Sequence, residues 1–319
     1  MYDYTLLAVP DMFASGVGAT LDLLASAARL ARVQGYAAPT WRVVSDEPRV
    51  TLSNGLGVDA TPLPGPDRSI WIVPGLCLAD ETSLKTLRER ACYRHPIEAL
   101  KAHASSGGTI AASCSAVFLL EAAGLLARRR ATTTWWLGGL LKTLAPTCAI
   151  DINKMVVDDG TIVTAGAAFA HLDLMLHLLR SRLSPTLADA VSREMVLDGR
   201  QSQAKFVLPA ALAGGNDLAG RLVALFEAAL PHPPSIEELA AKLGISSRTL
   251  LRHIKSSTGR SASALLQSVR INRARMLLET SNLSVEEIAA QVGYADTTAL
   301  RRLMRRVAQA TPRQFRASV

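Results

Sequence analysis

The sequence has little cysteine and no long hydrophobic run. Its four cysteines in 319 residues show no CxxC spacing, and no HExxH motif or paired Cys/His cluster is present. A disulfide scaffold and a metal site are therefore not expected, and the prediction is for reduced thiols and no metal. "GVGATLD" (16–22) lacks the third glycine of a dinucleotide-binding loop, so no cofactor is expected either. No stretch approaches the roughly 20 apolar residues of a membrane span, and no signal-like segment opens the chain. We expect a cytoplasmic protein with no membrane partner.

Charge is distributed unevenly along the chain. The length and the 49% hydrophobic content allow two domains, each with a core. Residues 231–319 hold 14 of the 35 Lys and Arg and 6 of the 27 Asp and Glu, an excess of eight positive charges, whereas residues 1–230 hold 21 of each. A neutral region joined to a basic one indicates a sensor or enzyme attached to a module that meets a polyanion such as DNA. A merely solvated basic surface is the alternative.

A weak internal repeat lies within the basic region. "SIEELAAKLG" (235–244) returns 49 residues later as "SVEEIAAQVG" (284–293), with six identities in ten positions. Each copy opens with Ser-x-x-Glu, which predicts a capping box, and ends in a glycine suited to stopping a helix. An arginine-bearing amphipathic segment follows each copy. The pattern predicts two helix-turn-helix units, whose second helices can enter the major groove of DNA.

A long predicted helix at about 261–279 joins the two units. This arrangement, with "INRARMLLETSNLSVEEIAAQVGY" and the closing "TPRQF", resembles the AraC/XylS family of bacterial transcription regulators over about 217–316. The resemblance implies that two recognition helices enter successive major-groove segments on one face of double-stranded DNA. Aligning Leu250 with Leu300 and Arg252 with Arg302 turns Leu250, Ile254, Leu300 and Met304 toward the core.

The same alignment assigns the DNA-contacting positions. The groove-facing residues are Arg248, Arg252, Thr297, Thr298 and Arg302, and the expected phosphate contacts are Ser247, Lys255, Arg301, Arg305 and Arg306. An arginine can pair with guanine O6 and N7, and a threonine can offer its methyl to thymine or its hydroxyl to phosphate. For each arginine, a phosphate contact or a solvated charge is the alternative.

The first 200 residues alternate strand-like and helical runs. Such an order predicts βα units forming a mostly parallel sheet with helices on both faces, and "NKMVVDDGTIVTAG" predicts a hairpin turning at Asp159-Gly160. Ligands in such sheets bind beyond the carboxyl ends of the strands. Cys114, in "GTIAASCSAVF", lies at a predicted strand-to-helix bend there. We expect a strained turn, an exposed side chain and a thiol pKa lowered by the helix N-terminus.

This bend, with "PGLC" (74–77) after an earlier strand, resembles the class I glutamine amidotransferase-like superfamily, specifically its PfpI-type branch, over about residues 4–200. The resemblance implies a flavodoxin-like, doubly wound α/β fold and an elbow cysteine assisted by a histidine and an acidic residue. Here Thr134 replaces the histidine of "ATTHW", and Gly16 stands where the acid aligns. His171, which begins a predicted helix, is the remaining candidate base. Without a base, the thiol is not activated for hydrolysis.

The combination is similar to the GlxA-like group of regulators. It implies an α/β domain over 1–200 for ligand sensing and dimerisation, a linker over 201–216 and an all-α DNA-binding domain with two helix-turn-helix units over 217–319. The predicted function is that of a sequence-specific transcriptional regulator, not an enzyme, with an operator, a small-molecule effector, a second copy of itself and, if it activates, RNA polymerase as partners. The candidate effector pocket comprises Gly75, Leu76, Cys114, Ser115, Thr134 and Trp135.

Two other readings stay open. A cysteine-dependent hydrolase or hydratase using Cys114 would carry the basic domain only for localisation. A structural nucleoid-type protein would bind DNA with little sequence preference.

Overall fold

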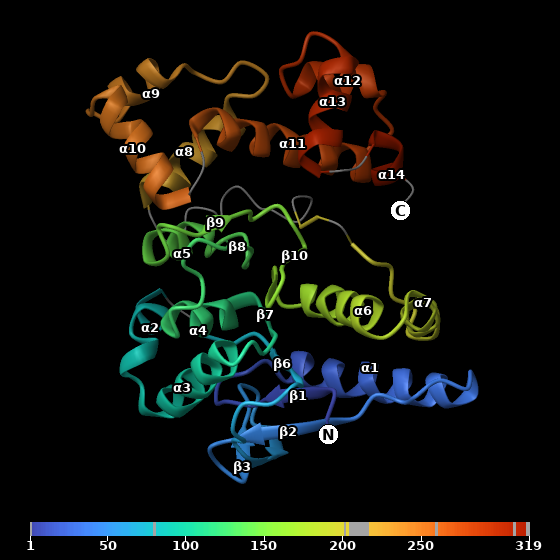
Figure 1. The fold of residues 1–319 in the computed structure, drawn as a ribbon. Helices are drawn as coiled ribbons and strands as arrows, with labels where there is room; N and C mark the ends of the chain where they lie inside the picture. The colour runs from blue at the N-terminus through green and yellow to red at the C-terminus, as the bar shows by residue number, and fades with distance from the viewer. Residues whose placement is uncertain are drawn as a thin grey trace. The chain divides into compact units, whose positions relative to one another are not determined.

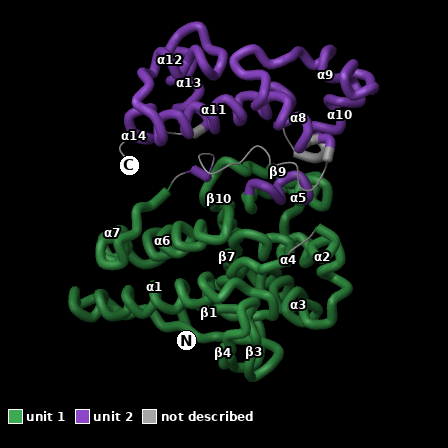
Figure 2. The backbone as a smooth tube through the Cα atoms, turned by 180° about the vertical axis from the view of Figure 1, so that it is seen from behind, with its two compact units in different colours: residues 1–134, 141–201 green, residues 135–140, 202–319 purple. Residues whose placement is uncertain are grey.

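The computed structural model describes residues 2–78, 81–200, 202–203, 217–258, 261–308 and 311–316. Two compact units divide the chain, one of residues 1–134 and 141–201 and the other of residues 135–140 and 202–319 (Figure 2). The predicted linker, 201–216, lies outside the described residues except for Ser202 and Gln203, so its extent stays a prediction.

The first unit is a parallel sheet covered by helices on both faces (Figure 1). Its main sheet has the strand order β10-β11-β7-β6-β1-β2-β5, and all neighbours are parallel except β10 and β11. The strands of this sheet are β1 (Tyr4–Leu7), β2 (Trp41–Ser45), β5 (Thr61–Pro62), β6 (Ile70–Val73), β7 (Ile110–Ser113), β10 (Val156–Asp159) and β11 (Ile162–Ala165). The small sheets pair β3 (Arg49–Thr51) with β4 (Gly57–Asp59) and β8 (Arg130–Ala131) with β9 (Ala149–Ile150).

The helices of this unit form two groups. On one side, α1, α6 and α7 contact one another, and on the other α3 contacts α4. The helices are α1 (Ala14–Val33), α2 (Glu81–Lys85), α3 (Ala91–Ser105), α4 (Val117–Ala122), α5 (Gly138–Leu144), α6 (Ala170–Arg182) and α7 (Pro185–Glu194), with 3-10 turns at Leu87–Glu89 and Cys114–Ala116. Residues 138–140, where α5 begins, belong to the second unit.

The central strands follow from their composition. All four residues of β1, β6, β7 and β11 are buried, as expected for strands that helices cover on both faces. The predicted hairpin is confirmed, since β10 pairs antiparallel with β11 and Gly160 takes φ +81° at the turn. Because β1, β6, β7 and β11 are parallel, their carboxyl ends meet at one edge of the sheet, where Cys114 follows β7.

The second unit is helical. It contains α8 (Asp217–Ala228), α9 (Ile236–Lys242), α10 (Ser247–Thr258), α11 (Ala262–Thr280), α12 (Val285–Gln291), α13 (Thr297–Ala308) and α14 (Pro312–Arg316). Both predicted capping boxes are confirmed: Ser235 and Ser284 each accept a backbone N–H three residues on, and Glu238 and Glu287 reach back. The pairs α9–α10 and α12–α13 are the two helix-turn-helix units, and both contact the long helix α11 directly or through α10.

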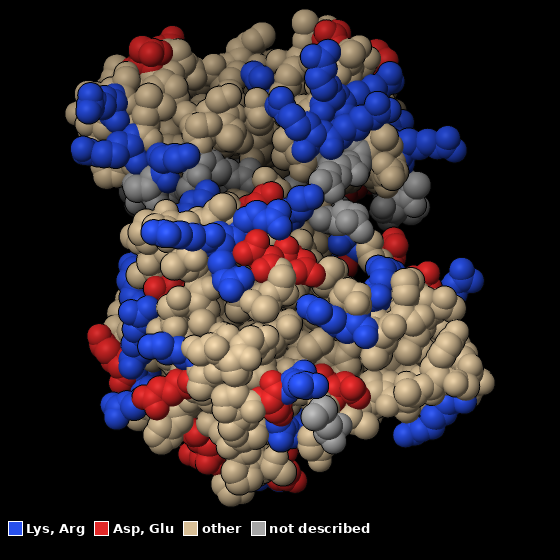
Figure 3. Space-filling view, viewed as in Figure 1, with Lys and Arg blue, Asp and Glu red and all other residues tan. Residues whose placement is uncertain are grey.

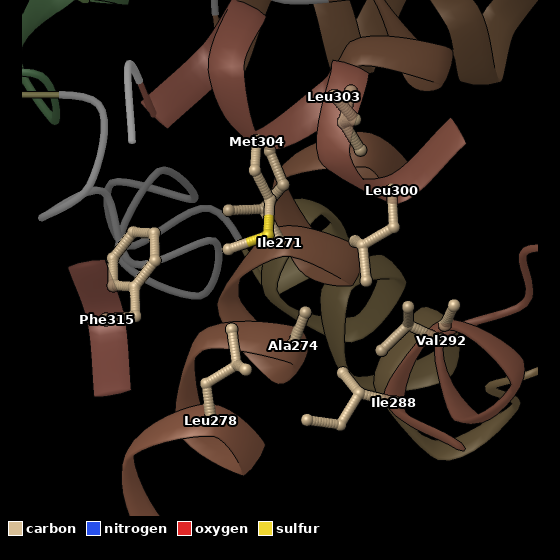
Figure 4. Close-up of a cluster of buried hydrophobic side chains, with 10 residues drawn as sticks. Ile271, Ala274, Leu278, Ile288, Val292, Leu300, Leu303, Met304 and Phe315 are labelled. Carbon is tan, nitrogen blue, oxygen red and sulfur yellow. The ribbon is translucent and has the colours of Figure 1, made fainter. Parts of the chain in front are cut away.

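The second helix-turn-helix has a closed apolar core. In Figure 4, Leu300 and Met304 of α13 lie near Ile271 of α11, and Phe315 of α14 borders the same cluster. The core residues are Ile271, Ala274, Leu278, Ile288, Ala289, Val292, Leu300, Leu303, Met304 and Phe315. Burial of this cluster, worth roughly 1.5–3 kcal/mol for each large side chain, holds α13 in place.

Two equivalent glycines end α9 and α12 with different surroundings. Gly244 and Gly293 both have positive φ, +67° and +83°. A Cβ on Gly244 would meet nothing within 4 Å, whereas one on Gly293 would lie 2.2 Å from the carbonyl oxygen of Pro231. We expect Gly244→Ala to cost about 1 kcal/mol for the left-handed backbone alone. Gly293→Ala should cost at least about twice that, because backbone must also shift.

Hydrogen exchange of the full chain measures the difference. The amides of α12 and α13 in Gly293→Ala should lose more protection than those of α9 and α10 in Gly244→Ala. Equal losses of amide protection in the two variants would show that the close approach of Pro231 to Gly293 does not restrict the residue at position 293.

Candidate functional site

The two recognition helices have the predicted orientation toward the core. Leu250 and Ile254 of α10, and Leu300 and Met304 of α13, are all fully buried. Each helix is also capped just before its start, since Ser246 Oγ accepts the N–H of Thr249 at 3.1 Å and Asp296 Oδ1 accepts that of Ala299 at 2.8 Å. The equivalence between the two units, inferred from sequence, therefore holds in three dimensions.

The predicted DNA-contacting side chains lie on the opposite faces. The exposed residues are Arg248, Arg252, Lys255, Thr298, Arg301, Arg302, Arg305 and Arg306, while Ser247 and Thr297 are half-buried. Figure 3 shows Lys and Arg gathered over the α13 end of the helical unit, with a smaller group over α10. The residues are thus available to a polyanion, and their contacts to bases or phosphates stay predictions.

Sequence reasoning missed one residue of this surface. Leu251 is 45% exposed on α10, one turn before Lys255. The alignment makes it the counterpart of Arg301, so the two units differ in chemistry at this position. The signal that could have found Leu251 is its place one residue after the buried Leu250, which turns it about 100° away from the core-facing side of the helix.

The elbow at Cys114 has the predicted strained backbone but not the predicted accessibility. Its φ is +57°, and Gly75 approaches so closely that a Cβ there would lie 2.7 Å from the Cβ of Cys114. The expectation of an exposed, acidified thiol is wrong: the residue is only 3% exposed, and burial raises its pKa to about 11. A helix N-terminus stabilises a thiolate by about 0.3–1 kcal/mol, which lowers the pKa by less than about one unit. Full desolvation can raise a pKa by about 3–5 units, so burial outweighs the helix.

Two backbone N–H groups close to Cys114 are already bonded to other parts of the protein. The N–H of Cys114 donates to Gly166 O at 2.8 Å, and the N–H of Leu76 donates to Ser115 Oγ at 2.9 Å. Ser115 Oγ in turn donates to Leu76 O at 2.5 Å. Acyl transfer requires free N–H groups aimed at a developing oxyanion, and these two are bonded within the protein.

Both ring nitrogens of His171 are hydrogen-bonded to hydroxyl groups and not to the thiol. Its Nε2 lies 2.7 Å from Thr20 Oγ1, and its Nδ1 lies 2.9 Å from Ser113 Oγ. Because Thr20 donates its hydroxyl hydrogen to Gly16 O, Nε2 must donate to Thr20, and Nδ1 accepts from Ser113. Complete burial lowers the pKa of His171 to about 4. The imidazole is therefore a neutral strut between α1 and β7 and not a base.

The expected acidic partner has no room at Gly16. A Cβ there would already lie 3.0 Å from the Cβ of Pro74. An acid that sequence reasoning missed, Asp11, follows β1 with φ +64°, but Arg90 Nη2 and Tyr93 Oη both donate to its Oδ2, at 2.7 and 2.8 Å. Its position in the loop after β1 is the signal that could have found it.

The remaining candidate pocket residues separate into two groups. Thr133 Oγ1 donates to Cys114 O at 2.7 Å, which ties the segment before Thr134 to the elbow. Thr134 is fully buried, and its Oγ1 has no hydrogen-bond partner among the described residues. Trp135 belongs to the other unit, with its ring 4.9 Å from that of Trp136 in an edge-to-face arrangement. The structure therefore brings together Gly75, Leu76, Cys114 and Ser115. Thr134 follows Thr133, which is hydrogen-bonded to the carbonyl oxygen of Cys114.

Within the described residues, no group of three or more His, Cys, Asp or Glu side chains could hold a metal ion. No helix in those same ranges is both long and apolar enough to cross a bilayer.

Two protein families match different parts of the chain. Residues 86–181 match the DJ-1/PfpI family, and residues 239–318 match a family described as a helix-turn-helix domain. The transcriptional regulator GbdR of Pseudomonas aeruginosa is 27% identical over 212 residues, which cover 66% of this chain and 58% of GbdR. The chain thus spans less than two thirds of that relative's length.

Solved structures confirm the α/β fold. A ThiJ/PfpI family protein from Pseudomonas syringae aligns with a TM-score of 0.51 and 17% identity, over 81% of this chain and 90% of that one. An AraC family transcriptional regulator from Pseudomonas putida aligns with a TM-score of 0.50 and 20% identity, over 61% of this chain and all of that one. The predicted fold class, a doubly wound sheet followed by a helical helix-turn-helix region, is confirmed.

The buried elbow predicts a slow thiol. With a pKa of about 11, roughly one Cys114 thiol in a thousand is ionised at pH 8. During alkylation of the native chain at pH 8, followed by peptide mass spectrometry, the exposed Cys77 should react first and Cys114 far more slowly. The Cys114 rate should rise as the pH approaches 11, and unfolding in urea should make all four thiols react alike. Fastest labelling at Cys114 would contradict this account and favour an enzyme.

Proposed function

We propose that this chain, which joins a DJ-1/PfpI family domain to an AraC-type helix-turn-helix domain, is a sequence-specific transcriptional regulator controlled by a small molecule. The observation that carries the proposal is the pair of equivalent helices, α10 and α13, whose apolar sides are buried while their arginines face outward. The regulators that the chain resembles in sequence support the same conclusion.

Base reading is assigned to the equivalent arginines Arg252 and Arg302. Each stands two residues after a buried leucine and two before a buried Ile or Met, so each points away from the core. A guanidinium so placed can donate two hydrogen bonds to guanine in the major groove. Thr298, one turn before Arg302, can add a methyl or hydroxyl contact.

The α/β unit is proposed to sense and not to catalyse. Its elbow keeps the strained turn and the close glycine, but the thiol is protonated, both ring nitrogens of His171 are bonded to hydroxyl groups, and the N–H groups of Leu76 and Cys114 are bonded within the protein. A nucleophile without a base and an oxyanion site gains none of their contributions to rate. These features argue against the hydrolase alternative.

The effector pocket is placed beside this elbow. A buried hydroxyl without a partner costs about 1–3 kcal/mol, and a bound polar molecule would relieve that cost at Thr134. A metabolite that raises the thermal midpoint of the wild type but not of Thr134→Val would support this placement. Binding unchanged by the substitution would put the effector elsewhere.

The same proposal includes the expected partners. A homodimer over the α/β domain, an operator in bacterial cytoplasm, and RNA polymerase if the protein activates are what a regulator of this kind requires. The domain limits at 200 and 217 belong to the proposal as well.

Loss of one base-reading arginine should be sequence-selective. We expect Arg252→Ala and Arg302→Ala each to weaken binding to an operator duplex, selected from random DNA with the wild-type chain, by about tenfold or more. Binding to a random duplex should weaken far less. Lys255→Ala is the matched control, because loss of a phosphate contact should weaken both duplexes equally. Fluorescence anisotropy measures all affinities.

If the two arginine variants lose affinity equally on both duplexes, neither residue reads bases. If selection with the wild type yields no preferred sequence, the nucleoid-type alternative replaces the proposal.

A further inference from the structure

Four arginines line an open groove between α13 and α14. The groove has a volume of about 440 Å³ and is lined by Val285, Arg301, Arg305, Thr311, Pro312, Arg313 and Arg316. Two arginines come from the recognition helix and two from the short helix that follows it. No carboxylate is among the described lining residues.

The sequence places these arginines through two local features. On α13, Arg301 and Arg305 are four residues apart and so lie one above the other on one side of the helix. After it, Thr311 donates its N–H and its hydroxyl to Gln314 Oε1, at 2.7 and 3.0 Å, which starts α14.

Apolar contacts then fix α14 in orientation. Pro312 and Phe315 are buried, and Phe315 belongs to the apolar cluster that also holds α11 and α13. With those two residues inside, Arg313 and Arg316 remain exposed. Arg316 is held by a hydrogen bond to the backbone oxygen of Leu283. These contacts hold α14 so that its two arginines lie beside the recognition helix.

None of the four guanidinium groups forms an ion pair with a described residue, and only Arg316 has a hydrogen bond there, to the carbonyl oxygen of Leu283. Neighbouring like charges repel one another, so such a cluster is unfavourable unless an anion enters it. Arginine suits phosphate in particular, because its planar fork can donate two hydrogen bonds to one phosphate group.

The groove occupies one flank of the recognition helix. Thr298 and Arg302 lie on the face of α13 opposite the buried Leu300 and Met304, while Arg301 and Arg305 turn toward α14. A helix inserted in a major groove has a sugar–phosphate strand along each flank. The flank that faces α14 would therefore meet one of these strands while Arg302 reaches the bases.

The described residues of the first helix-turn-helix differ at the position that matches this groove. Leu251 stands at the position of Arg301, and α10 is followed by the long helix α11 and not by a short arginine-bearing helix. The two units are thus chemically unequal, although their caps and cores are alike.

We infer that the groove between α13 and α14 is a phosphodiester site that clamps one DNA backbone strand beside the second recognition helix. The inference rests on the proposed function and names a site within it. Through Arg313 and Arg316, α14 adds sequence-independent affinity to the second half-site, whereas the first half-site depends more on its base contacts.

Salt titration of the full chain tests the clamp. The probes are the operator duplex selected by the wild type and a random duplex of equal length. Arg313→Ala should weaken both by the same factor, roughly fivefold, and lower the slope of log K against log [salt] by about 0.9, the value for one lost phosphate contact. Arg313→Lys keeps the charge and should restore most of the slope. The matched control is Arg273→Ala, which removes an exposed arginine of α11 outside the groove and should leave the slope unchanged.

Each outcome bears on the inference. An unchanged slope in Arg313→Ala, or a loss on the operator alone, overturns the clamp while the wild type's preference for its operator still supports the proposed function. A wild type without preference refutes the proposed function instead. Equal slope losses in Arg313→Ala and Arg273→Ala would mean diffuse charge and no site. The circular dichroism spectrum of each variant must match that of the wild type, which shows that the fold is kept. Recovery of the slope in Arg313→Lys then assigns the effect of Arg313→Ala to lost charge.

Discussion

The packing of α11 against helices of both helix-turn-helix units is the constraint on which the proposed DNA-reading surface depends. Ile271, Ala274 and Leu278 of this helix belong to the core of the second helix-turn-helix unit. Nearer its start, Leu265 and Val269 are fully buried, and the helix contacts α8 and α10. Its 19 residues extend roughly 28 Å, close to the ~34 Å repeat of B-DNA. A single helix thus sets the distance between the two helices that we propose to read neighbouring groove segments.

The contact between Pro231 and Gly293 adds to this constraint. The loop before the first helix-turn-helix unit reaches the turn of the second helix-turn-helix unit. There, Gly293 leaves room for the carbonyl oxygen of Pro231. Arg270 of α11 lies over the ring of Tyr294 at 5.0 Å, next to the same glycine. The two helix-turn-helix units are therefore joined by backbone contacts as well as by apolar packing on α11. A change in the spacing of the recognition helices would break both kinds of contact.

The α/β unit has the strained backbone of a catalytic elbow, but its cysteine is buried and protonated. The strained Cys114 and the close Gly75 are retained, while the N–H of Leu76 donates to Ser115 Oγ and the Nδ1 of His171 is bonded to Ser113 Oγ. A site of this kind can still bind a ligand. Such a ligand alters DNA binding only if it favours one of two conformations, so its effect would depend on differential affinity and not on turnover.

Local features could be predicted from sequence, and long-range ones could not. The capping boxes at Ser235 and Ser284 and the turn at Gly160 depend on residues within three or four positions, and all three are present. The partners of His171 lie 151 and 58 residues away, so no pattern marks it as a strut.

Burial shows the same limit of sequence reasoning. A strand-to-helix bend indicates a reactive cysteine, but whether Cys114 is exposed depends on what covers it. Leu251 shows the converse, an apolar residue exposed on a surface assigned to arginines. Each of these depends on tertiary packing, which residue spacing along the chain does not encode.

Hydroxyl-radical footprinting of the full chain on its selected duplex tests the central claim most directly. Two helices held by α11 should protect two patches on one face of the DNA, about 10 base pairs apart. Protection should extend further along the backbone at the second patch, where α14 lies beside α13. A single patch, or uniform protection without a register, would contradict the claim that α10 and α13 read adjacent groove segments together.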